Sequence, residues 1–415
     1  MSSDVAGKGR SRRILCVVPA MGLGGAQRAM AMLVEHLCVR HDVLLLTWEP
    51  PHTRPFFPVP PQAAVLQADL LGGTGVRRIS RILRRHPVLR GLVKARRPDV
   101  VISFIDTTNI TAVLSCLGTG VPVVVSERAD PSRHRIGVMK SWLRSLSYRF
   151  ATRVVVQTNR IRGHFPPRVQ DRSVIIPNGV PVPAHFAAPS RPDGDGRYRM
   201  IALGRLSPEK RFDMLMQAFA ALAPRYPDWD LVIYGEGDEQ VRLEALRDNL
   251  GLSQRIALPG PTSDPLPELV KSHAIACPSR YEGFPNALAE GMSVGLPAVG
   301  TAGVSGIEDL ILDGETGFLV AADGGAPALA EALEKIISDD DAREQLGQAA
   351  RRHLRNWYAP DVLKRWEDLI EQILAEKYVR STARSSPRRE QPTSGNATAW
   401  LRSDQPFVEI RVLRH

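Results

Sequence analysis

Apolar runs of strand length alternate with segments of helical periodicity along almost the whole chain. A chain with this alternation folds as βα units, which place a parallel sheet between two layers of helices. We expect strands near residues 13–18, 42–47, 99–104, 121–126, 153–156 and 173–176, and again near residues 199–203, 230–234, 255–258, 274–277, 297–300 and 317–320. The pattern therefore predicts an α/β protein with a parallel sheet in each half.

The chain of 415 residues is long enough for two domains, each with its own core. A turn at residues 177–180 precedes a stretch rich in Pro, Gly and Asp, which is typical of a linker. We expect a flexible N-terminus at 1–12, a first domain at 13–180, a linker at 181–197, a second domain at 198–358, a helix at 359–378 and a disordered basic tail at 379–415.

The composition is that of an ordinary globular protein, with 43% hydrophobic and 24% charged residues. No apolar run approaches the ~18 residues that a membrane-spanning helix needs. The four cysteines lie in apolar contexts without the spacing of a metal site, which favours buried thiols in a reducing cytoplasm.

The positive charge is concentrated in the first half of the chain. Residues 1–180 contain 27 Lys and Arg against 10 Asp and Glu, a balance of +17, whereas the remainder contains 27 against 34, a balance of −7. A basic half beside an acidic half suggests that the first domain faces a polyanion or an anionic membrane.

Two carboxylates eight residues apart, Glu282 and Glu290, bracket a Gly-Phe-Pro-Asn sequence. Pro285 suits the first position of a helix, because an N–H group at that position makes no hydrogen bond within the helix. The free N–H groups at such a helix N-terminus attract phosphate. Eight helical residues span ~12 Å, about the reach from a hexose across a diphosphate to a ribose. Taken alone, the same pair also fits a surface helix with two solvated acids.

A second candidate segment lies upstream, where a short apolar strand ends at Gly204 and leads to Arg205 and Lys210. A diphosphate leaving group requires cations that are already in place when its charge develops. Arg205 can donate two parallel hydrogen bonds to phosphate oxygens, and Lys210 can act as a point charge. The alternative is that both cations only cap the next helix from solvent.

These segments resemble the retaining glycosyltransferases of family 4, which have the GT-B fold. The resemblance is carried by Gly204-Arg205, Pro208-Glu209-Lys210, the pair Glu282 and Glu290, and Asp313-Gly-Glu-Thr-Gly317, and more loosely by the glycine-rich Gly22-Leu-Gly24-Gly25-Ala-Gln-Arg28. It covers about residues 13–375. It implies two Rossmann-like domains whose parallel sheets face an interdomain cleft, with the helix at 359–378 returning to the first domain.

The resemblance also implies roles for individual residues. Arg205 and Lys210 would hold the donor diphosphate, Glu290 the ribose, and Glu282 the transferred sugar. The other donor-binding positions would be Gly24, Gly25, Gly204, Gly283, Phe284, Pro285 and Asn286. The glycine-rich loop also invites a dinucleotide-binding interpretation, but the third glycine of that fingerprint is replaced by Gln27.

A cluster of charge ends the strand at 121–126, where Ser126, Glu127 and Arg128 follow one another. This sequence resembles family members that act on lipid-linked saccharides, so Glu127 and Arg128 could orient the donor sugar or the acceptor hydroxyl. Asp106, with Asn109 nearby in the preceding strand–helix segment, is a competing candidate for the base. A structural ion pair between Glu127 and Arg128 is the alternative.

Two basic segments in the first half also carry apolar and aromatic residues. Residues 76–97 contain nine Arg or Lys and no acid, and His86-Pro87 interrupts the helical pattern. Residues 133–153 add Trp142, Tyr148 and Phe150 to six cations. Basic amphipathic segments bind anionic lipid, and Trp and Tyr favour the interfacial layer. We therefore expect peripheral association with the cytoplasmic face of the cell membrane, although a helix packed on the sheet explains the same pattern.

The sequence thus predicts an enzyme that transfers a sugar, with retention, from a nucleotide-diphosphate sugar to a hydroxyl of a lipid-linked saccharide in polysaccharide or glycolipid biosynthesis. The resemblance favours a UDP-hexose or UDP-N-acetylhexosamine donor. No metal or other cofactor is expected, because cations and helix dipoles would neutralise the leaving group. Two alternatives remain, a nucleotide-sugar epimerase and a non-enzymatic membrane- or nucleic-acid-binding protein. No nucleic-acid motif is present, so no nucleic-acid partner is expected.

Overall fold

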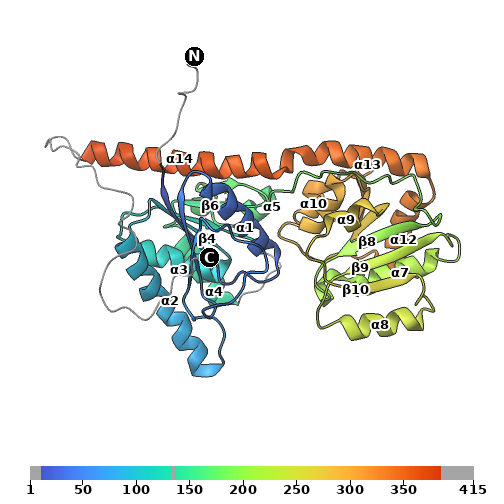
Figure 1. Cartoon of the computed structure of the whole chain (residues 1–415), viewed down its shortest axis with the longest axis horizontal. Coiled ribbons are helices and arrows are strands. Elements are labelled where there is room, and N and C mark those ends of the chain that lie inside the picture. The colour runs from blue at the N-terminus through green and yellow to red at the C-terminus, as the bar shows by residue number, and fades with distance from the viewer. Residues whose placement is uncertain (1–10, 132–136, 385–415) are drawn as a thin grey trace, which may run out of the picture.

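The computed structural model describes residues 11–131 and 137–384, with side chains described as far as residue 379. It contains two parallel sheets, each covered by helices, and a long C-terminal helix that runs beside them (Figure 1). The flexible N-terminus expected at 1–12 and the tail expected at 379–415 fall largely outside the described residues.

The first sheet has the strand order β3-β2-β1-β4-β5-β6-β7, and all its neighbours pair in parallel. Its strands are β1 (Arg13–Val17), β2 (Asp42–Thr47), β3 (Ala64–Gln67), β4 (Val100–Phe104), β5 (Val123–Ser126), β6 (Arg153–Val156) and β7 (Ser173–Ile175). The six expected strands are present, but the sequence analysis missed β3. This edge strand has only four residues, pairs on one side only and ends in the polar Gln67, so its apolar run is too short to stand out.

Helices cover both faces of this sheet. They are α1 (Gly25–Cys38), α2 (Gly75–Arg96), α3 (Asp106–Cys116), α4 (Val138–Tyr148), α5 (Asn159–Gly163) and α6 (Pro167–Gln170). Successive strand residues point to opposite faces. Ile14 and Cys16 therefore join α1 in one core cluster, while Leu15 and Val17 join buried residues of α2, α3 and α4 in another.

Helix α2 runs without interruption through Pro87, so the expected break at His86-Pro87 is wrong. Its second half is fixed by tertiary packing, because Leu89 and Val93 are fully buried in the core, and this outweighs the local cost of the proline. The first half has no such packing. Residues 75–80 are exposed all round, and this end of α2 projects from the domain (Figure 1).

The second sheet has the order β10-β9-β8-β11-β12-β13 and is also parallel throughout. Its strands are β8 (Tyr198–Leu203), β9 (Trp229–Tyr234), β10 (Ile256–Gly260), β11 (Ala274–Cys277), β12 (Ala298–Thr301) and β13 (Gly317–Val320). The helices of this half are η1 (Pro208–Lys210), α7 (Phe212–Leu222), α8 (Gln240–Asn249), α9 (Leu266–Val270), α10 (Asn286–Ser293), α11 (Ile307–Leu310), α12 (Gly325–Ile337), α13 (Asp340–Leu354) and η2 (Arg355–Trp357). All six expected strands are present, which confirms the predicted alternation.

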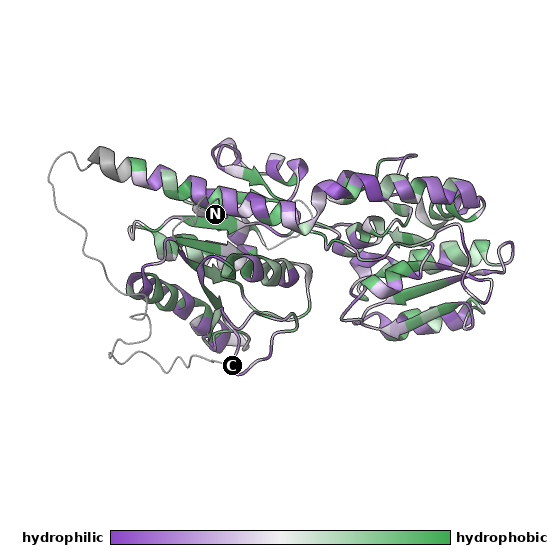
Figure 2. Cartoon of the chain, turned by 45° about the horizontal axis from the view of Figure 1, so that its top comes forward, coloured by the Kyte–Doolittle hydropathy of each residue, from purple (hydrophilic) through white to green (hydrophobic). Residues whose placement is uncertain are grey.

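The C-terminal helix α14 (Ala359–Arg384) packs on the first sheet, although it follows the second domain in sequence (Figure 1). Its ribbon alternates between purple and green in Figure 2, and its buried residues are Val362, Trp366, Leu369, Ile370, Ile373 and Leu374. The helix continues six residues beyond its expected end at Tyr378. Neither Gly nor Pro occurs between Ala375 and Arg384, so nothing local ends it earlier.

The two domains approach each other most closely at two glycines, which have no side chain. A Cβ atom at Gly25 would collide with the amide nitrogen of Asn286, and one at Gly283 would collide with the carbonyl oxygen of Arg128. The hydroxyl groups of Thr158 and Ser305, one from each domain, lie 2.7 Å apart. Glycine at these two positions therefore permits the close approach that forms the cleft.

We predict that Trp366→Ala lowers the free energy of unfolding by about 3–5 kcal/mol, the usual cost of removing a fully buried tryptophan side chain. Trp366 is 2% exposed and stacks near the ring of Phe104 at a centroid distance of 5.7 Å. Urea unfolding followed by circular dichroism measures the change. The neighbouring exposed residue provides the control, because Arg365→Ala should change stability by no more than about 0.5 kcal/mol. Equal effects of the two substitutions would contradict the packing of α14.

Candidate active site

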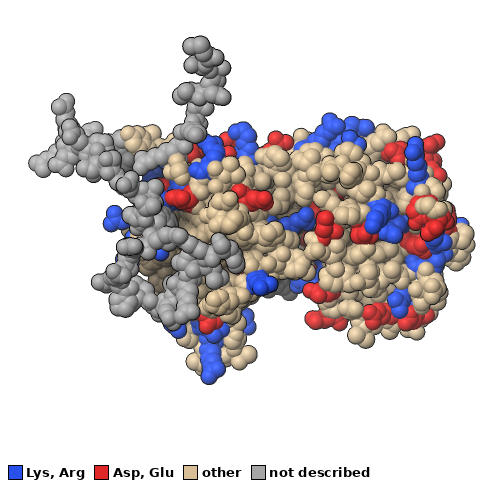
Figure 3. Space-filling view, viewed as in Figure 1, with Lys and Arg blue, Asp and Glu red and all other residues tan. Residues whose placement is uncertain are grey.

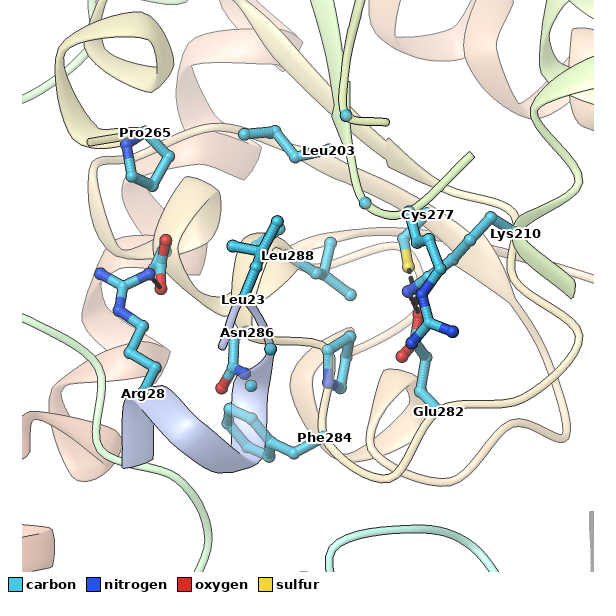
Figure 4. A pocket seen from close by; sticks show the side chains of 18 of the residues that line it. Leu23, Arg28, Leu203, Lys210, Pro265, Cys277, Glu282, Phe284, Asn286 and Leu288 are labelled. Carbon is cyan, nitrogen blue, oxygen red and sulfur yellow. Dashed lines mark hydrogen bonds and ion pairs between the residues drawn. The ribbon is translucent and has the colours of Figure 1, made fainter. Parts of the chain in front are cut away.

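A cavity of about 960 Å³ lies between the two domains. Its walls are the loops that follow the carboxyl ends of the strands in both sheets, where α/β proteins bind their ligands. The first domain contributes the turn at Gly24 and Gly25 after β1, and Arg128 to Asp130 of the loop after β5. The second domain contributes the loops after β8 and β11, and helix α10 (Figure 4).

Lys210 and Glu282 form an ion pair in this cavity. Nζ of Lys210 lies 2.5 Å from Oε1 of Glu282, which also accepts a hydrogen bond of 2.7 Å from the Ser279 hydroxyl. Burial alone would lower the pKa of Lys210, but the Glu282 carboxylate and the nearby Cys277 raise it above its ordinary value. Lys210 is therefore a fixed cation at neutral pH.

Arg205 lies next to this pair in sequence and also lines the cavity, but its side chain is exposed. The strand β8 ends at Leu203, and Gly204 then brings the chain close to the Lys210 side chain, whose Cε would lie 3.2 Å from a Cβ atom at that position. The two cations thus stand on one wall, as expected for groups that hold a diphosphate.

Arg28 of the first domain lies on the other side of the cavity from Lys210 and Glu282 (Figure 4), and it pairs with Glu290. The Glu290 side chain is 4% exposed. Burial raises the pKa of Glu290, and the adjacent Arg28 guanidinium opposes that rise. The sequence analysis quoted Arg28 only as part of the glycine-rich loop and gave it no role, because a pairing across domains leaves no local pattern.

The segment between the two glutamates forms the floor of the cavity. Gly283, Phe284, Pro285 and Asn286 all line it, and α10 begins at Asn286. Pro285 is therefore the residue before the helix rather than its first residue, a shift of one position. Leu288 also lines the cavity, and Met292 is buried in the core of the second domain.

A chain of hydrogen bonds joins the first domain to α10. Asn178 donates from Nδ2 to Oδ1 of Asn286 at 2.7 Å, and its own Oδ1 accepts hydrogen bonds from Arg128 and, at 2.8 Å, from Gln157. The Arg128 guanidinium lies 3.8 Å from the ring centroid of Phe104, and burial lowers the pKa of Arg128 to about 9.

The sequence analysis did not select Gln157 or Asn178, which also line the cavity. Gln157 directly follows the predicted strand at 153–156. The rule that ligands bind beyond the carboxyl ends of parallel strands would have found it.

Three candidate residues of the first domain do not line the cavity. Glu127 accepts a hydrogen bond of 3.0 Å from the Tyr148 hydroxyl and lies 3.7 Å from Nη1 of Arg144, so its charged partner is Arg144 rather than the Arg128 of the alternative interpretation. Asn109 donates to the same Tyr148 oxygen at 2.9 Å and to the Ser126 carbonyl at 2.8 Å. Asp106 is buried at the start of α3.

The polar residues that follow β4 and β5 are therefore mostly structural, because they form a buried cluster behind the cavity wall. Burial raises the pKa of Glu127 to about 7, with Arg144 opposing the shift. Arg128, which follows Glu127 directly, is the member of this segment that lines the cavity.

Within residues 11–131 and 137–384, no group of three or more His, Cys, Asp or Glu side chains has a metal-binding arrangement. Among the same residues, no helix has the length and apolar character required to cross a membrane.

Two family models match the chain. Residues 23–182 match the model described as Glycosyltransferase Family 4, and residues 188–353 match the model described as Glycosyl transferases group 1. The boundary between them falls in the linker that joins the two sheets.

Individual relatives cover much of the chain at low identity. An exopolysaccharide phosphotransferase of Streptomyces coelicolor is 27% identical over 88% of this chain, which spans 40% of that protein's length. An α-1,4-N-acetyl-D-galactosaminyltransferase of Campylobacter jejuni, whose name specifies a PP-undecaprenol-linked saccharide, is 25% identical over 87% of this chain and 99% of its own length.

A crystal structure of HepE from Anabaena in complex with UDP superposes with a TM-score of 0.69 at 17% identity, covering 87% of this chain and 100% of HepE. This likeness confirms the predicted fold of two Rossmann-like domains around a cleft. The two models together cover most of the described chain, and the protein belongs to the group 1, family 4 glycosyltransferases of GT-B fold.

Proposed function

We propose that this glycosyltransferase moves a sugar from a UDP-sugar to a hydroxyl of a lipid-linked saccharide, with retention of the anomeric configuration. The observation that carries the proposal is that Lys210 and Glu290 line one cavity from opposite sides, with the N-terminus of α10 between them. A cation and a carboxylate separated in this way match the diphosphate and the ribose of one nucleotide.

Both charges are neutralised within the protein before the donor binds. Lys210 is paired with Glu282, and Glu290 is paired with Arg28. The donor would replace these partners, so that Lys210 and Arg205 bind phosphate oxygens while Glu290 accepts hydrogen bonds from the ribose hydroxyls. Glu282 would then be free to accept a hydrogen bond from the transferred sugar.

In the proposed reaction, the acceptor hydroxyl attacks the anomeric carbon from the face that the diphosphate leaves. The bond from that carbon to the phosphate oxygen breaks as the new glycosidic bond forms, and the departing phosphate takes the proton of the hydroxyl. Arg205, Lys210 and the dipole of α10 would stabilise the developing charge, without a bound metal ion. This route needs no protein base, which agrees with the placement of Glu127 and Asp106 outside the cavity.

The choice of donor and acceptor rests on two relatives. HepE was crystallised with UDP in a structure of the same fold. The Campylobacter relative is named as a transferase of N-acetylgalactosamine that acts on a PP-undecaprenol-linked saccharide. A UDP-hexose or UDP-N-acetylhexosamine is therefore our proposed donor, and a saccharide on a lipid diphosphate is our proposed acceptor.

The projecting end of α2 supports peripheral binding to the cytoplasmic face of a membrane, where such an acceptor would be found. Val76, Ile79 and Leu83 recur on one side of the helix and are 82%, 59% and 68% exposed. Arg77 and Arg78 are exposed beside them, and positive charge is visible at this end of the molecule in Figure 3. Exposed apolar residues among cations are typical of a helix that lies on anionic lipid.

We predict that Lys210→Ala lowers turnover by about 10²–10³, the usual effect of removing a group that stabilises a leaving oxygen. The assay measures UDP released from a panel of UDP-sugars in the presence of a bacterial lipid extract. Lys271→Ala removes an exposed lysine outside the cavity and serves as the control. Full activity of a folded Lys210→Ala protein would refute the assignment.

Nucleotide binding tests both the choice of base and the role of Glu290 at the ribose. We expect calorimetry to show tighter binding of UDP than of GDP, and Glu290→Ala to weaken UDP binding by about tenfold or more, because hydrogen bonds to a charged group contribute ~1.5–3 kcal/mol each. Glu236→Ala removes another carboxylate from the same cavity and is the control. Tighter binding of GDP would redirect the proposal to a GDP-sugar, and loss of UDP binding in both variants would argue against a specific ribose contact.

The membrane proposal predicts that the double variant Val76→Ser, Ile79→Ser binds vesicles of phosphatidylcholine and phosphatidylglycerol about tenfold more weakly at low salt. Two apolar side chains leave the lipid, each contributing ~1 kcal/mol or more. Val39 and Val241 are 81% and 78% exposed on other helices or turns, so Val39→Ser, Val241→Ser is the matched control. A wild-type protein that ignores these vesicles in a sedimentation assay would contradict the proposal.

A further inference from the structure

A second cavity, of about 700 Å³, lies in the first domain and is lined by four arginines. Arg149 follows α4, Arg153 begins β6, Arg168 lies in α6, and Arg172 precedes β7. The cavity is thus at the amino ends of the strands, whereas the donor cavity is at their carboxyl ends. The four residues of β6 separate Arg153 from Gln157 by about 13 Å, so the two cavities are distinct.

The charge in this arginine cavity is incompletely neutralised. Arg153 pairs with Glu376 of α14 at 2.6 Å, and Arg172 donates a hydrogen bond of 3.3 Å to the carbonyl of Ala151. Asp171 also lines the cavity. In the part of the chain that the structure describes, no ion pair or side-chain hydrogen bond engages Arg149 or Arg168. Four guanidinium groups against two carboxylates leave a surplus of two positive charges, which suits the planar, bidentate binding of a phosphate ester.

An apolar stripe on α4 leads to the same cavity. Met139, Trp142 and Leu146 follow one another at intervals of three or four residues, so they share one side of the helix, and Phe150 lies in the turn directly after it. Met139, Trp142 and Phe150 are 78%, 65% and 58% exposed. Leu146 and Phe150 line the cavity, so the stripe ends at the arginines. A large exposed apolar surface next to a cationic pocket needs a ligand that is apolar at one end and anionic at the other.

We propose that the arginine cavity binds the phosphate headgroup of an acidic membrane phospholipid, whose chains lie along the α4 stripe. The site is separate from the donor cavity and does not depend on the identity of the donor. Helix α4 spans about 16 Å, and its C-terminal end lies at the cavity. A lipid bound there would hold α4 against the membrane and keep the mouth of the cleft at its surface.

The test compares two double variants that lose the same charge. Arg149→Gln, Arg168→Gln removes the two cavity arginines that have no partner, and Arg352→Gln, Arg355→Gln removes two exposed arginines of the second domain. Binding is measured by flotation with vesicles of phosphatidylcholine, with and without phosphatidylglycerol. We expect the cavity variant to bind the mixed vesicles about tenfold more weakly or worse, and the control variant to bind within about twofold of wild type.

Two further measurements separate the headgroup from its alternatives. Met139→Ser, Trp142→Ser should weaken vesicle binding while leaving calorimetric binding of glycerol 3-phosphate unchanged, because neither residue lines the arginine cavity. UDP binding should be unchanged in every variant, because none of these residues lines the donor cavity.

Equal losses in the cavity and control variants would overturn the site in favour of general charge attraction. Equal affinity for inorganic phosphate and for the vesicles would overturn the lipid assignment in favour of a soluble phosphate.

Discussion

The ion pair between Arg28 and Glu290 joins the two domains at the cavity. Glu290 is almost completely buried, and a buried carboxylate without a counter-ion is strongly destabilising. Its counter-ion comes from α1 of the other domain, directly after the glycine-rich turn. The position of the first domain over α10 and the charge state of Glu290 therefore depend on the same contact, and a ligand that binds Glu290 acts on both.

Helix α14 also contacts residues that join the two domains. Its Trp366 ring lies 5.8 Å from the guanidinium of Arg128, which contacts Phe104 and donates to Asn178. Asn178 in turn donates to Asn286 at the start of α10. A continuous series of contacts thus runs from a helix that follows the second domain in sequence, through the first domain, to the donor loop of the second. The return of α14 positions the cleft as well as covering the sheet.

The parts of this architecture that have a local pattern were predictable from the sequence. Twelve strands follow from apolar runs, and the resemblance correctly gave the fold. Lys210, Glu282 and Glu290 do line one cavity. The edge strand β3 and the continuity of α2 through Pro87 were missed because pairing and packing, rather than local sequence, determine them. The partners Arg28 for Glu290 and Arg144 for Glu127 were missed because each comes from a distant segment.

The helices α2 and α4 lie on one face of the first sheet, where each packs against α3. Both keep apolar residues in solvent, although the core beneath them is complete without these side chains. Such exposure is unfavourable in water, and a contiguous exposed apolar patch marks a surface that binds a partner or a membrane. If a membrane covers these helices, the first domain is held against the lipid. The second domain forms the other wall of the cleft and is not held by these helices. The proposed sugar donor would then enter from the aqueous side, and the lipid-linked acceptor would reach the same cavity from the membrane.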